Sequence, residues 1–286
     1  MLALLSLTIT PLVMAGPKSG FFVTSDKARL HYLEAGKGPT IVFVPGWTMP
    51  AEIWAPQIRY FSKRFHVIAL DPRGQGDSAV APGGYNPKRR AQDIAELVDH
   101  LELERFVLVG WSLAVLEGLA YTRFFGQDRL AGLVLVDNSV GEEPPPAATD
   151  FVSRFRKDRR RAMQGFIKGM FHTKQTQAYY DRLLRRSLKI PKQAALDLFF
   201  NLYPREQWRQ MVYAVTRPLL YIVRPSFREQ AMNLKSKRPD TWVEVFEDAG
   251  HALFVDEPDR FNTLLDYFIA VEVEHTRLAA TTLRKQ

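Results

Sequence analysis

The chain has 286 residues, of which 46% are apolar and 24% are charged, a composition typical of a globular protein rather than a disordered, collagen-like or coiled-coil one. It contains no Cys, which excludes disulfides, a thiol nucleophile and Cys-based metal sites. The formal net charge of +8 would suit an acidic partner if the positive charge were gathered on one surface.

The first 15 residues predict a secretory signal peptide. Residues 2–15 form an almost uninterrupted apolar run that is too short to cross a bilayer as a helix. Small residues stand before Gly16, where a signal peptidase would cut, so we expect a secreted or periplasmic protein. No Lys or Arg precedes the run, which leaves open a buried N-terminal segment of a cytoplasmic protein or an uncleaved anchor.

Short β-rich runs then alternate with amphipathic helical patterns. Residues 21–24 and 29–34 predict an antiparallel pair of strands. Five later runs predict strands buried on both faces: residues 40–44, 65–70, 106–109, 133–136 and 219–223. Helical patterns lie between them at residues 51–63, 87–101 and 113–125. The alternation predicts an α/β fold with a mostly parallel central sheet flanked by helices.

One strand-to-helix turn carries a candidate nucleophile. Residues 106–114 run from a buried strand through the pattern G-x-S-x-A into a helix. A Ser on such a turn has its hydroxyl pushed out at the top of the sheet. Gly110 and Ala114 are small, as the crowded strand and helix backbones require. Ser112 is therefore the candidate nucleophile; the alternative is that it only caps the helix.

A helical insert is predicted at residues 141–217. The segment 141–146, which contains three prolines, ends the alternation after the fourth buried strand. Residues 150–217 hold 16 Lys or Arg and 5 Asp or Glu, so the excess positive charge of the chain lies in the insert. No nucleic-acid-reading motif accompanies it, and we expect a solvated basic face and no nucleic-acid partner. Contact with an anionic membrane surface or an acidic substrate is the alternative.

The insert is rich in aromatic residues. Because it leaves from strand ends, it is expected to lie over the carboxyl-terminal edge of the sheet, where α/β proteins bind ligands. The rings either pack the insert onto the sheet domain or line an apolar pocket: Phe151, Phe155, Phe166, Phe171, Tyr179, Tyr180, Phe199, Phe200, Tyr203 and Trp208.

Three further motifs give the chain a family resemblance. Pro45-Gly46-Trp47, the turn at residues 71–78 (DPRGQGDS) and Ala249-Gly250-His251 follow one another around the Ser112 turn. In this order they resemble the motifs of the α/β-hydrolase fold superfamily, over about residues 20–270. The resemblance implies a core formed by residues 16–140 and 218–286, with residues 141–217 as a helical cap or lid.

The resemblance and the chemistry together suggest roles for four residues. Ser112 is a poor nucleophile at its own pKa and needs a base. His251 follows the last predicted strand, at residues 241–246, where the family keeps its catalytic histidine. The backbone N–H groups of Trp47 and Leu113 would form the oxyanion hole. Pro45 replaces the family's His, a change that leaves backbone donors intact.

The triad acid departs from the usual pattern. Most relatives place an Asp shortly after the penultimate strand, where this chain has residues 224–228 (RPSFR). Asp137 ends the strand after the nucleophile helix, the position used by dehalogenase-like relatives, and we expect it to orient His251. Glu229 is the nearest carboxylate after the penultimate strand and stays an alternative, as does an absent or water-linked acid.

No cofactor or metal is expected. The chain has neither a metal-ligand pattern nor a dinucleotide-binding G-x-G-x-x-G. The Asp71 turn is expected to be structural, with its glycines allowing the turn and Arg73 pairing locally.

These features predict a cofactor-free serine hydrolase that cleaves a carboxylic ester or similar acyl compound with an apolar acyl or alcohol group. Ser112 argues against the epoxide hydrolases and haloalkane dehalogenases of the family, whose nucleophile is Asp. Lactone hydrolysis, C–C bond hydrolysis and perhydrolysis would use the same residues. The alternative hypothesis is a ligand- or partner-binding protein on the same fold with weak or lost catalysis.

Overall fold

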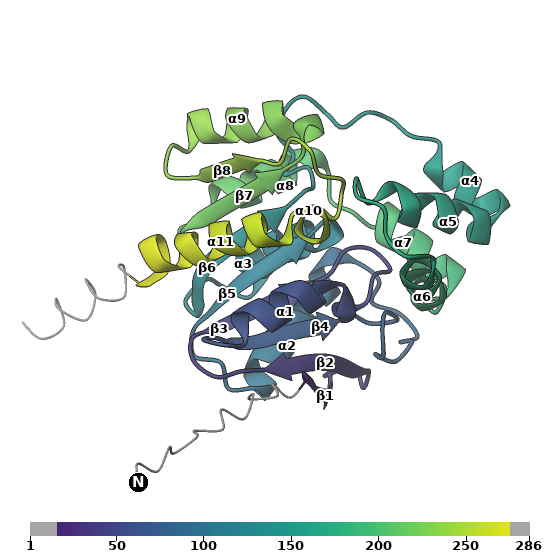
Figure 1. Cartoon of the computed structure of the whole chain (residues 1–286), viewed down its shortest axis with the longest axis horizontal. Helices are drawn as coiled ribbons and strands as arrows, with labels where there is room; N and C mark the ends of the chain where they lie inside the picture. Colours follow the sequence, from purple (N-terminus) through teal and green to yellow (C-terminus); the bar gives the residue numbers. More distant parts are fainter. Residues whose placement is uncertain (1–15, 275–286) are drawn as a thin grey trace, which may run out of the picture.

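A computed structural model describes residues 16–274, so the predicted signal peptide at residues 1–15 lies outside the described part of the chain. Within that part, one 8-stranded sheet forms the centre of the molecule (Figure 1). Its strands are β1 (Lys18–Val23), β2 (Arg29–Ala35), β3 (Thr40–Val44), β4 (His66–Asp71), β5 (Phe106–Trp111), β6 (Leu130–Val136), β7 (Leu219–Val223) and β8 (Trp242–Val245).

The sheet is mostly parallel. Its spatial order is β1-β2-β4-β3-β5-β6-β7-β8. β2 pairs antiparallel with both β1 and β4, whereas the strands from β3 to β8 run parallel to one another. The predicted α/β class, the opening antiparallel pair and the mostly parallel sheet are confirmed.

The parallel register brings the carboxyl ends of the central strands to one edge. Val44 of β3 lies beside Gly110 of β5, and Trp111 of β5 lies beside Val136 of β6. Every residue of β5, β6 and β7 is buried, because helices cover both faces of these strands. The loops that follow β3, β5 and β6 therefore emerge next to one another, where α/β sheets build their ligand sites.

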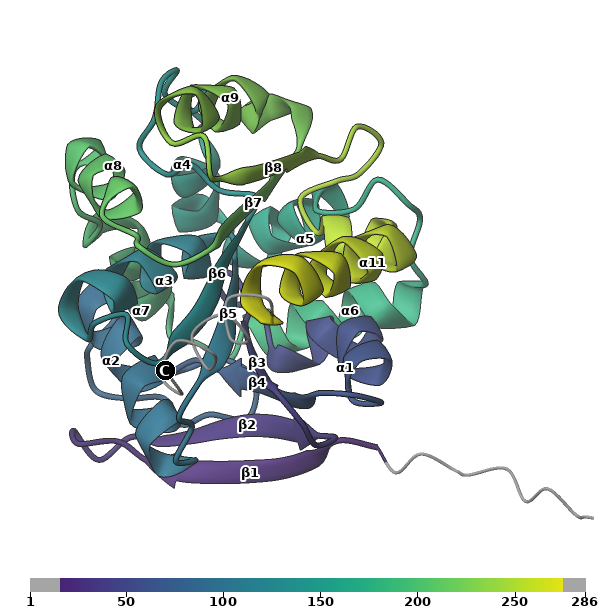
Figure 2. The same cartoon turned by 90° about the vertical axis from the view of Figure 1, so that its left-hand side faces the viewer.

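Helices flank the sheet on both sides. The helices α2, α3 and α8 lie on one face, and α1 and α11 lie on the other (Figure 2). α9 packs beside the edge strand β8. The helices are α1 (Ala55–Phe61), α2 (Pro87–His100), α3 (Leu113–Phe124), α4 (Phe151–Lys157), α5 (Arg159–Gly169), α6 (Gln177–Ser187), α7 (Lys192–Phe200), α8 (Arg205–Tyr213), α9 (Arg228–Lys237), α10 (Leu253–Asp256) and α11 (Pro258–Phe268), with short 3₁₀ turns η1 (Ala51–Trp54) and η2 (Pro225–Phe227) and the final π-helical turn η3 (Ile269–Glu274).

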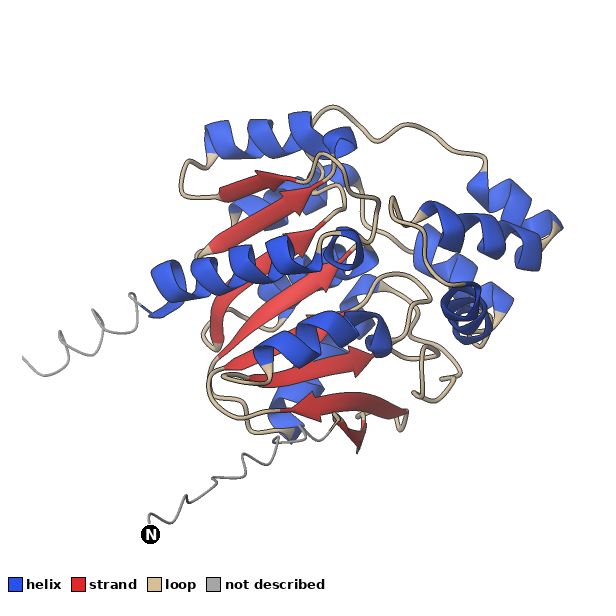
Figure 3. Cartoon of the chain, viewed as in Figure 1, coloured by secondary structure: helices blue, strands red, loops and turns tan. Residues whose placement is uncertain are grey.

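The insert divides into two parts. Its helices α4 to α7 lie beyond the carboxyl ends of the strands, and no strand lies between them (Figures 1 and 3). We call these four helices the cap. The last helix of the predicted insert, α8, instead packs against α3, with Trp208 buried and backbone atoms of Arg205 and Arg209 close to Gly141. The predicted insert at residues 141–217 therefore includes one helix that packs beside α3 as well as the four that lie beyond the strand ends.

Two elements differ locally from expectation. β6 begins at Leu130 rather than at residue 133, and its register with β5 shifts between Phe106 and Val107. The helical pattern predicted at residues 51–63 is divided into η1 and α1, and Pro56 stands in the first turn of α1. Proline suits a first turn because it lacks an N–H donor. No helix in residues 16–274 is long and apolar enough to cross a membrane.

Candidate active site

Ser112 occupies a strained turn between β5 and α3. Its backbone has φ 55° and ψ −119°, a conformation that costs energy for a residue with a side chain. A Cβ added at Gly110 would lie 2.3 Å from the carbonyl oxygen of Ala114, which explains the glycine. The Ser112 N–H donates to the Val136 carbonyl (2.8 Å), so the turn is tied to the end of β6. This is the geometry that the G-x-S-x-A pattern predicts.

Ser112, His251 and Asp137 form a continuous hydrogen-bonded chain. The Ser112 Oγ lies 2.9 Å from His251 Nε2, and His251 Nδ1 lies 2.6 Å from Asp137 Oδ2. An ionised carboxylate only accepts hydrogen bonds, so Nδ1 carries the imidazole proton. The Nε2 lone pair then faces the Ser112 hydroxyl, as a general base requires.

The surrounding structure fixes the histidine and the acid. The Trp111 indole N–H donates to the His251 carbonyl (2.7 Å), and the two rings are 5.1 Å apart. The Asp256 carboxylate accepts from the Gly250 N–H (2.8 Å). Asp137 is fully buried and its N–H donates to the Ile222 carbonyl of β7 (2.8 Å). These contacts fix the loop that carries His251 and the backbone of Asp137 at the end of β6.

Asp137 has a second partner that no motif in the sequence indicated. Arg224, which directly follows β7, donates from Nε to Asp137 Oδ2 (2.6 Å) and from its backbone N–H to Oδ1 (2.9 Å). β6 and β7 are neighbours in the sheet, so the residues that follow the two strands lie side by side, an adjacency that no sequence pattern gives. Glu229, the alternative acid, is exposed in the first turn of α9, and His251 Nδ1 bonds to Asp137 instead.

The candidate oxyanion loop follows β3 and packs against the nucleophile turn. A Cβ added at Gly46 would lie 2.8 Å from the Ser112 Cβ, so only glycine allows this approach. Among the described residues, the backbone N–H groups of Trp47 and Leu113 have no hydrogen-bond acceptor. Two such donors beside Ser112 are what a developing oxyanion needs.

The Trp47 side chain joins this loop to the cap. Its indole N–H donates to the Ala195 carbonyl of α7 (2.8 Å). Four cap rings lie within 4.6–5.6 Å of the Trp47 ring: Phe151, Phe155, Phe166 and Phe199. These rings therefore pack the cap onto the loop, and Phe151 and Phe166 also line the pocket described next.

A pocket of about 340 Å³ between the cap and the sheet edge reaches His251. Its lining comprises Phe151, Arg154, Ala162, Gly165, Phe166, Gly169, Met170, Arg224 and His251. Larger hollows of about 570–700 Å³ lie elsewhere on the described surface, but their linings include none of Ser112, His251 or Asp137. The small pocket reaches the candidate site through His251 alone, since its lining includes neither Ser112 nor Asp137.

The comparisons with known proteins agree with this architecture. The family model described as "Alpha/beta hydrolase family" matches residues 41–264. The chain belongs to the alpha/beta hydrolase family. It is 35% identical over 126 residues to a non-heme haloperoxidase of Rhodococcus erythropolis and 34% identical over 119 residues to a soluble epoxide hydrolase of Corynebacterium sp. (strain C12). These matches cover 44% and 39% of this chain, and they span 44% and 42% of those proteins' lengths.

Solved structures show the same fold. An esterase from Exiguobacterium antarcticum superposes with a TM-score of 0.76 at 22% identity, covering 87% of this chain and 98% of that one. A bromoperoxidase from Bacillus anthracis gives a TM-score of 0.76 at 21% identity, covering 88% of this chain and 100% of that one. At this identity the likeness establishes the fold alone.

In this family member, a chain of buried polar side chains supports the candidate oxyanion loop. Gln75 Nε2 donates to the carbonyls of Gly46 (3.0 Å) and Met49 (2.7 Å). Gln75 Oε1 accepts from the Thr48 N–H and from Arg90 Nη1, both at 3.1 Å. Arg90 in turn pairs with Glu117 of α3. None of these three linking side chains was predicted from the sequence to have a role at the site.

Burial dominates the ionisation of Glu117. Complete burial raises the pKa of its carboxyl to about 7, while the charge of Arg90 opposes this rise and that of Asp93 adds to it. Glu117 therefore gains or loses a proton near neutral pH. It pairs with Arg90, which donates to Gln75, the side chain that holds the loop.

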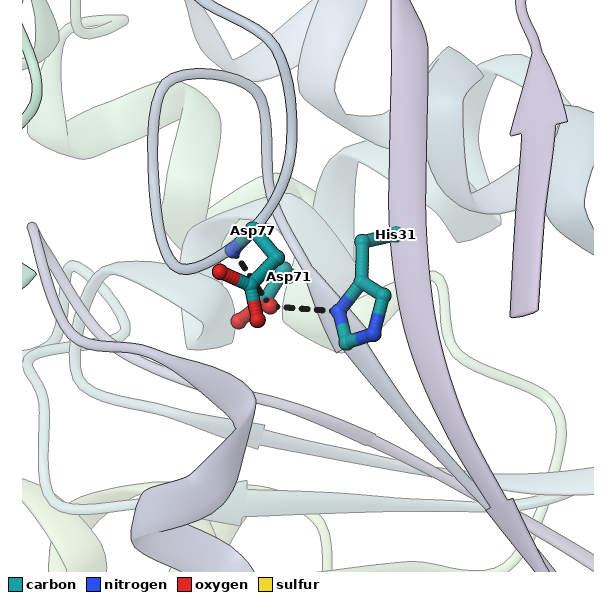
Figure 4. Close-up of side chains that lie close together, drawn as sticks. All are labelled: His31, Asp71 and Asp77. Atoms are coloured by element: carbon teal, nitrogen blue, oxygen red, sulfur yellow. Dashed lines mark hydrogen bonds and ion pairs between the residues drawn. The ribbon is translucent and has the colours of Figure 1, made fainter. Parts of the chain in front are cut away.

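The Asp71 turn forms a separate structural cluster (Figure 4). One ring nitrogen of His31 and one carboxylate oxygen each of Asp71 and Asp77 all lie within 4.8 Å of one another. Asp71 accepts hydrogen bonds from His31 Nδ1 (2.7 Å), the Asp77 N–H (2.9 Å) and the Ala51 N–H (2.5 Å). The Asp77 carboxylate pairs with Arg186 of the cap, which lowers its pKa. Their contacts are thus used to connect β2, η1 and the cap.

The prediction that Arg73 pairs locally, within the Asp71 turn, is wrong. Its side chain is fully buried, and it donates to Asp93 of α2 (2.6 Å) and to Asp26 in the β1–β2 turn (2.8 Å). A buried guanidinium needs a carboxylate partner, and none within the turn is in position to supply one. Arg73 therefore joins three distant segments.

Proposed function

We propose that this chain is a serine hydrolase that cleaves a carboxylic ester or a similar acyl compound through an acyl-enzyme on Ser112. The observation that carries the proposal is the hydrogen-bonded chain from Ser112 Oγ through His251 to the buried Asp137. It stands at the carboxyl ends of the strands and borders a pocket. A Ser at the nucleophile position also favours acyl transfer over epoxide opening, although one relative is named an epoxide hydrolase.

The acylation step follows from the geometry. As Ser112 Oγ attacks the carbonyl carbon, its proton moves to His251 Nε2, and Asp137 stabilises the imidazolium through Nδ1–H. The negative charge that develops on the carbonyl oxygen accepts hydrogen bonds from the N–H groups of Trp47 and Leu113. The tetrahedral intermediate then breaks its bond to the leaving alcohol, which takes the proton from Nε2.

The deacylation step repeats these roles with water. His251 removes a proton from a water molecule as its oxygen attacks the acyl carbon, and the proton is passed to Ser112 Oγ as the acyl–oxygen bond breaks. The products are a carboxylic acid, an alcohol and the free enzyme. Every proton is accounted for by the side chains of this site.

The proposed substrate is a small molecule. The apolar rings of Phe151 and Phe166 favour an apolar acyl or alcohol portion. Among the relatives, one is named an esterase/perhydrolase and another an (E)-2-((N-methylformamido)methylene)succinate hydrolase. These names support an acyl substrate and do not choose between an ester and an amide.

Labelling with a fluorophosphonate probe, followed by peptide mapping, tests the proposal. We expect a covalent adduct on Ser112 in the wild type, no adduct in Ser112→Ala, and turnover of 4-nitrophenyl esters only by the wild type. An unlabelled wild type that hydrolyses no ester would support the alternative, a binding protein on the same fold. Circular dichroism of both proteins serves as the control for folding.

A further inference from the structure

Arg224 is held at the edge of the active-site pocket by the same carboxylate that orients His251. Both His251 Nδ1 and Arg224 Nε lie 2.6 Å from Asp137 Oδ2. Asp137 is fully buried, whereas the Arg224 side chain is 30% exposed. The guanidinium is therefore anchored at one end and reaches the surface of the pocket at the other.

The outer part of this guanidinium has donors to spare. The contacts to Asp137 use only Nε and the backbone N–H of Arg224. Its four Nη protons have no acceptor within residues 16–274. A guanidinium presents its Nη protons in a planar fork that fits a carboxylate. Because the donor group is already immobilised, little conformational entropy is lost when it binds an anion.

A second arginine lines the same pocket. Arg154 of α4 contributes to the lining, and its Nε pairs with the exposed Asp150 at 2.9 Å. The lining contains no Asp or Glu. The cap segment, residues 150–200, has 13 Lys or Arg against 4 Asp or Glu, which gives a positive field around the pocket. Such a field attracts anionic ligands and repels cationic ones.

We propose that Arg224 and Arg154 bind a carboxylate of the substrate, so that the hydrolase prefers esters that carry a negative charge over neutral esters of the same shape. The proposal rests on the proposed function, since it names the substrate class of the same site. The cap aromatics would contact the apolar chain between the ester and the carboxylate. A charge on the substrate thus fixes its position relative to His251.

Two pairs of substrates test this preference. Mono-4-nitrophenyl adipate carries a carboxylate at the far end of its acyl chain. The matched neutral substrate, the 4-nitrophenyl ester of adipic acid monoamide, carries a carboxamide there. The hexanoates of 4-hydroxybenzoate and 4-hydroxybenzamide make the same comparison on the alcohol side. We expect the wild type to show a kcat/KM at least about tenfold higher for the anionic member of one pair, as charge-assisted hydrogen bonds allow.

Single variants then assign the preference to the two arginines. Arg154→Gln and Arg224→Gln are each expected to reduce the anionic-to-neutral ratio toward one, mainly by raising KM for the anionic ester. Arg224→Gln also disturbs Asp137, but that loss affects both esters of a pair and cancels in the ratio. Arg228→Gln is the matched control: it removes the same charge from α9, where Arg228 pairs with Glu247 and is not in the lining.

The outcomes separate the two proposals. Hydrolysis of neutral and anionic esters with a ratio near one, or a ratio that neither arginine variant changes, would overturn the carboxylate site and leave the serine hydrolase intact. If no ester turns over and Ser112 is not labelled, the proposed function fails. Calorimetry with adipate then tests the carboxylate site by itself. We expect the wild type to bind adipate and Arg154→Gln to bind it about tenfold more weakly. Equal binding by the two proteins, or no detectable binding, would reject the carboxylate site.

Discussion

The guanidinium of Arg90 lies 3.0 Å from the carboxylate of Glu117, and both side chains are only 1% exposed. The pair joins α2 to the nucleophile helix α3. Arg90 also donates to Gln75, which holds the carbonyls of Gly46 and Met49. Buried ion pairs add little net stability compared with apolar side chains of similar size, so the value of this one lies in where it fixes its neighbours. We infer that it positions the candidate oxyanion loop.

Replacing Gln75 by Leu should lower kcat by on the order of 10²-fold, with a smaller change in KM, because the loop loses its hydrogen bonds while the pocket keeps its lining. Steady-state kinetics with a 4-nitrophenyl ester measure this split. Gln75→Glu keeps the acceptor for Thr48 but loses the two donors, and it should also be slow. A Gln75→Leu variant with normal kcat and a fold unchanged by circular dichroism would refute the positioning role.

The raised pKa of Glu117 predicts a pH dependence of stability. Between its ordinary value of 4.5 and about 7, the folded chain keeps a proton that the unfolded chain has released. The free energy of unfolding therefore falls as the pH rises through this window, by on the order of 3 kcal/mol from this group. Below pH 4.5 both states are protonated and the contribution is constant.

Urea unfolding of the wild type and Glu117→Gln at pH 5, 6 and 7 checks this prediction. The wild type should lose stability relative to the variant as the pH rises. Glu104→Gln, at an exposed position, is the matched control and should run parallel to the wild type. A constant difference between wild type and Glu117→Gln across this range would show that Glu117 is ionised throughout.

The two candidate acids can be told apart by substitution. Asp137→Asn should reduce turnover on the order of a thousandfold or more, by analogy with the serine protease triad, because the amide no longer holds His251 in the required tautomer. Glu229→Gln should remain close to the wild type, since Glu229 is exposed on α9. Ester turnover by both variants gives the comparison, and the reverse order of activities would assign the acid to Glu229.

Gly165 of α5 offers a test of the pocket. It lines the pocket, and a Cβ added there meets no atom within 4 Å. Gly165→Leu should fill this space and lower kcat/KM for 4-nitrophenyl octanoate about tenfold more than for the acetate. Leu has a higher helix propensity than Gly, so the Tm should not fall. Gln164→Leu, exposed on the same helix, is the control, and equal loss on both esters would place the acyl chain elsewhere.

The sequence by itself determined the elements and the local turns. Apolar runs and helical periodicity predicted the strands and helices, because burial on one or both faces leaves a pattern within a few residues. The turn around Ser112 was predicted for the same reason, since its small residues act on backbone atoms near in sequence. The basic, aromatic insert over the strand ends followed from composition and from the rule for α/β sheets.

Only the tertiary structure decided contacts between distant segments. The sequence left Asp137 and Glu229 as alternatives, and the register of β6, β7 and the His251 loop brings Asp137 to the imidazole. Arg224 and Gln75 acquire their partners from segments tens of residues away, and α8 packs on α3 although it continues the insert. Side-chain chemistry limits which residues can pair. Strand order and crossover geometry determine which of them are in contact, and no local sequence pattern encodes these.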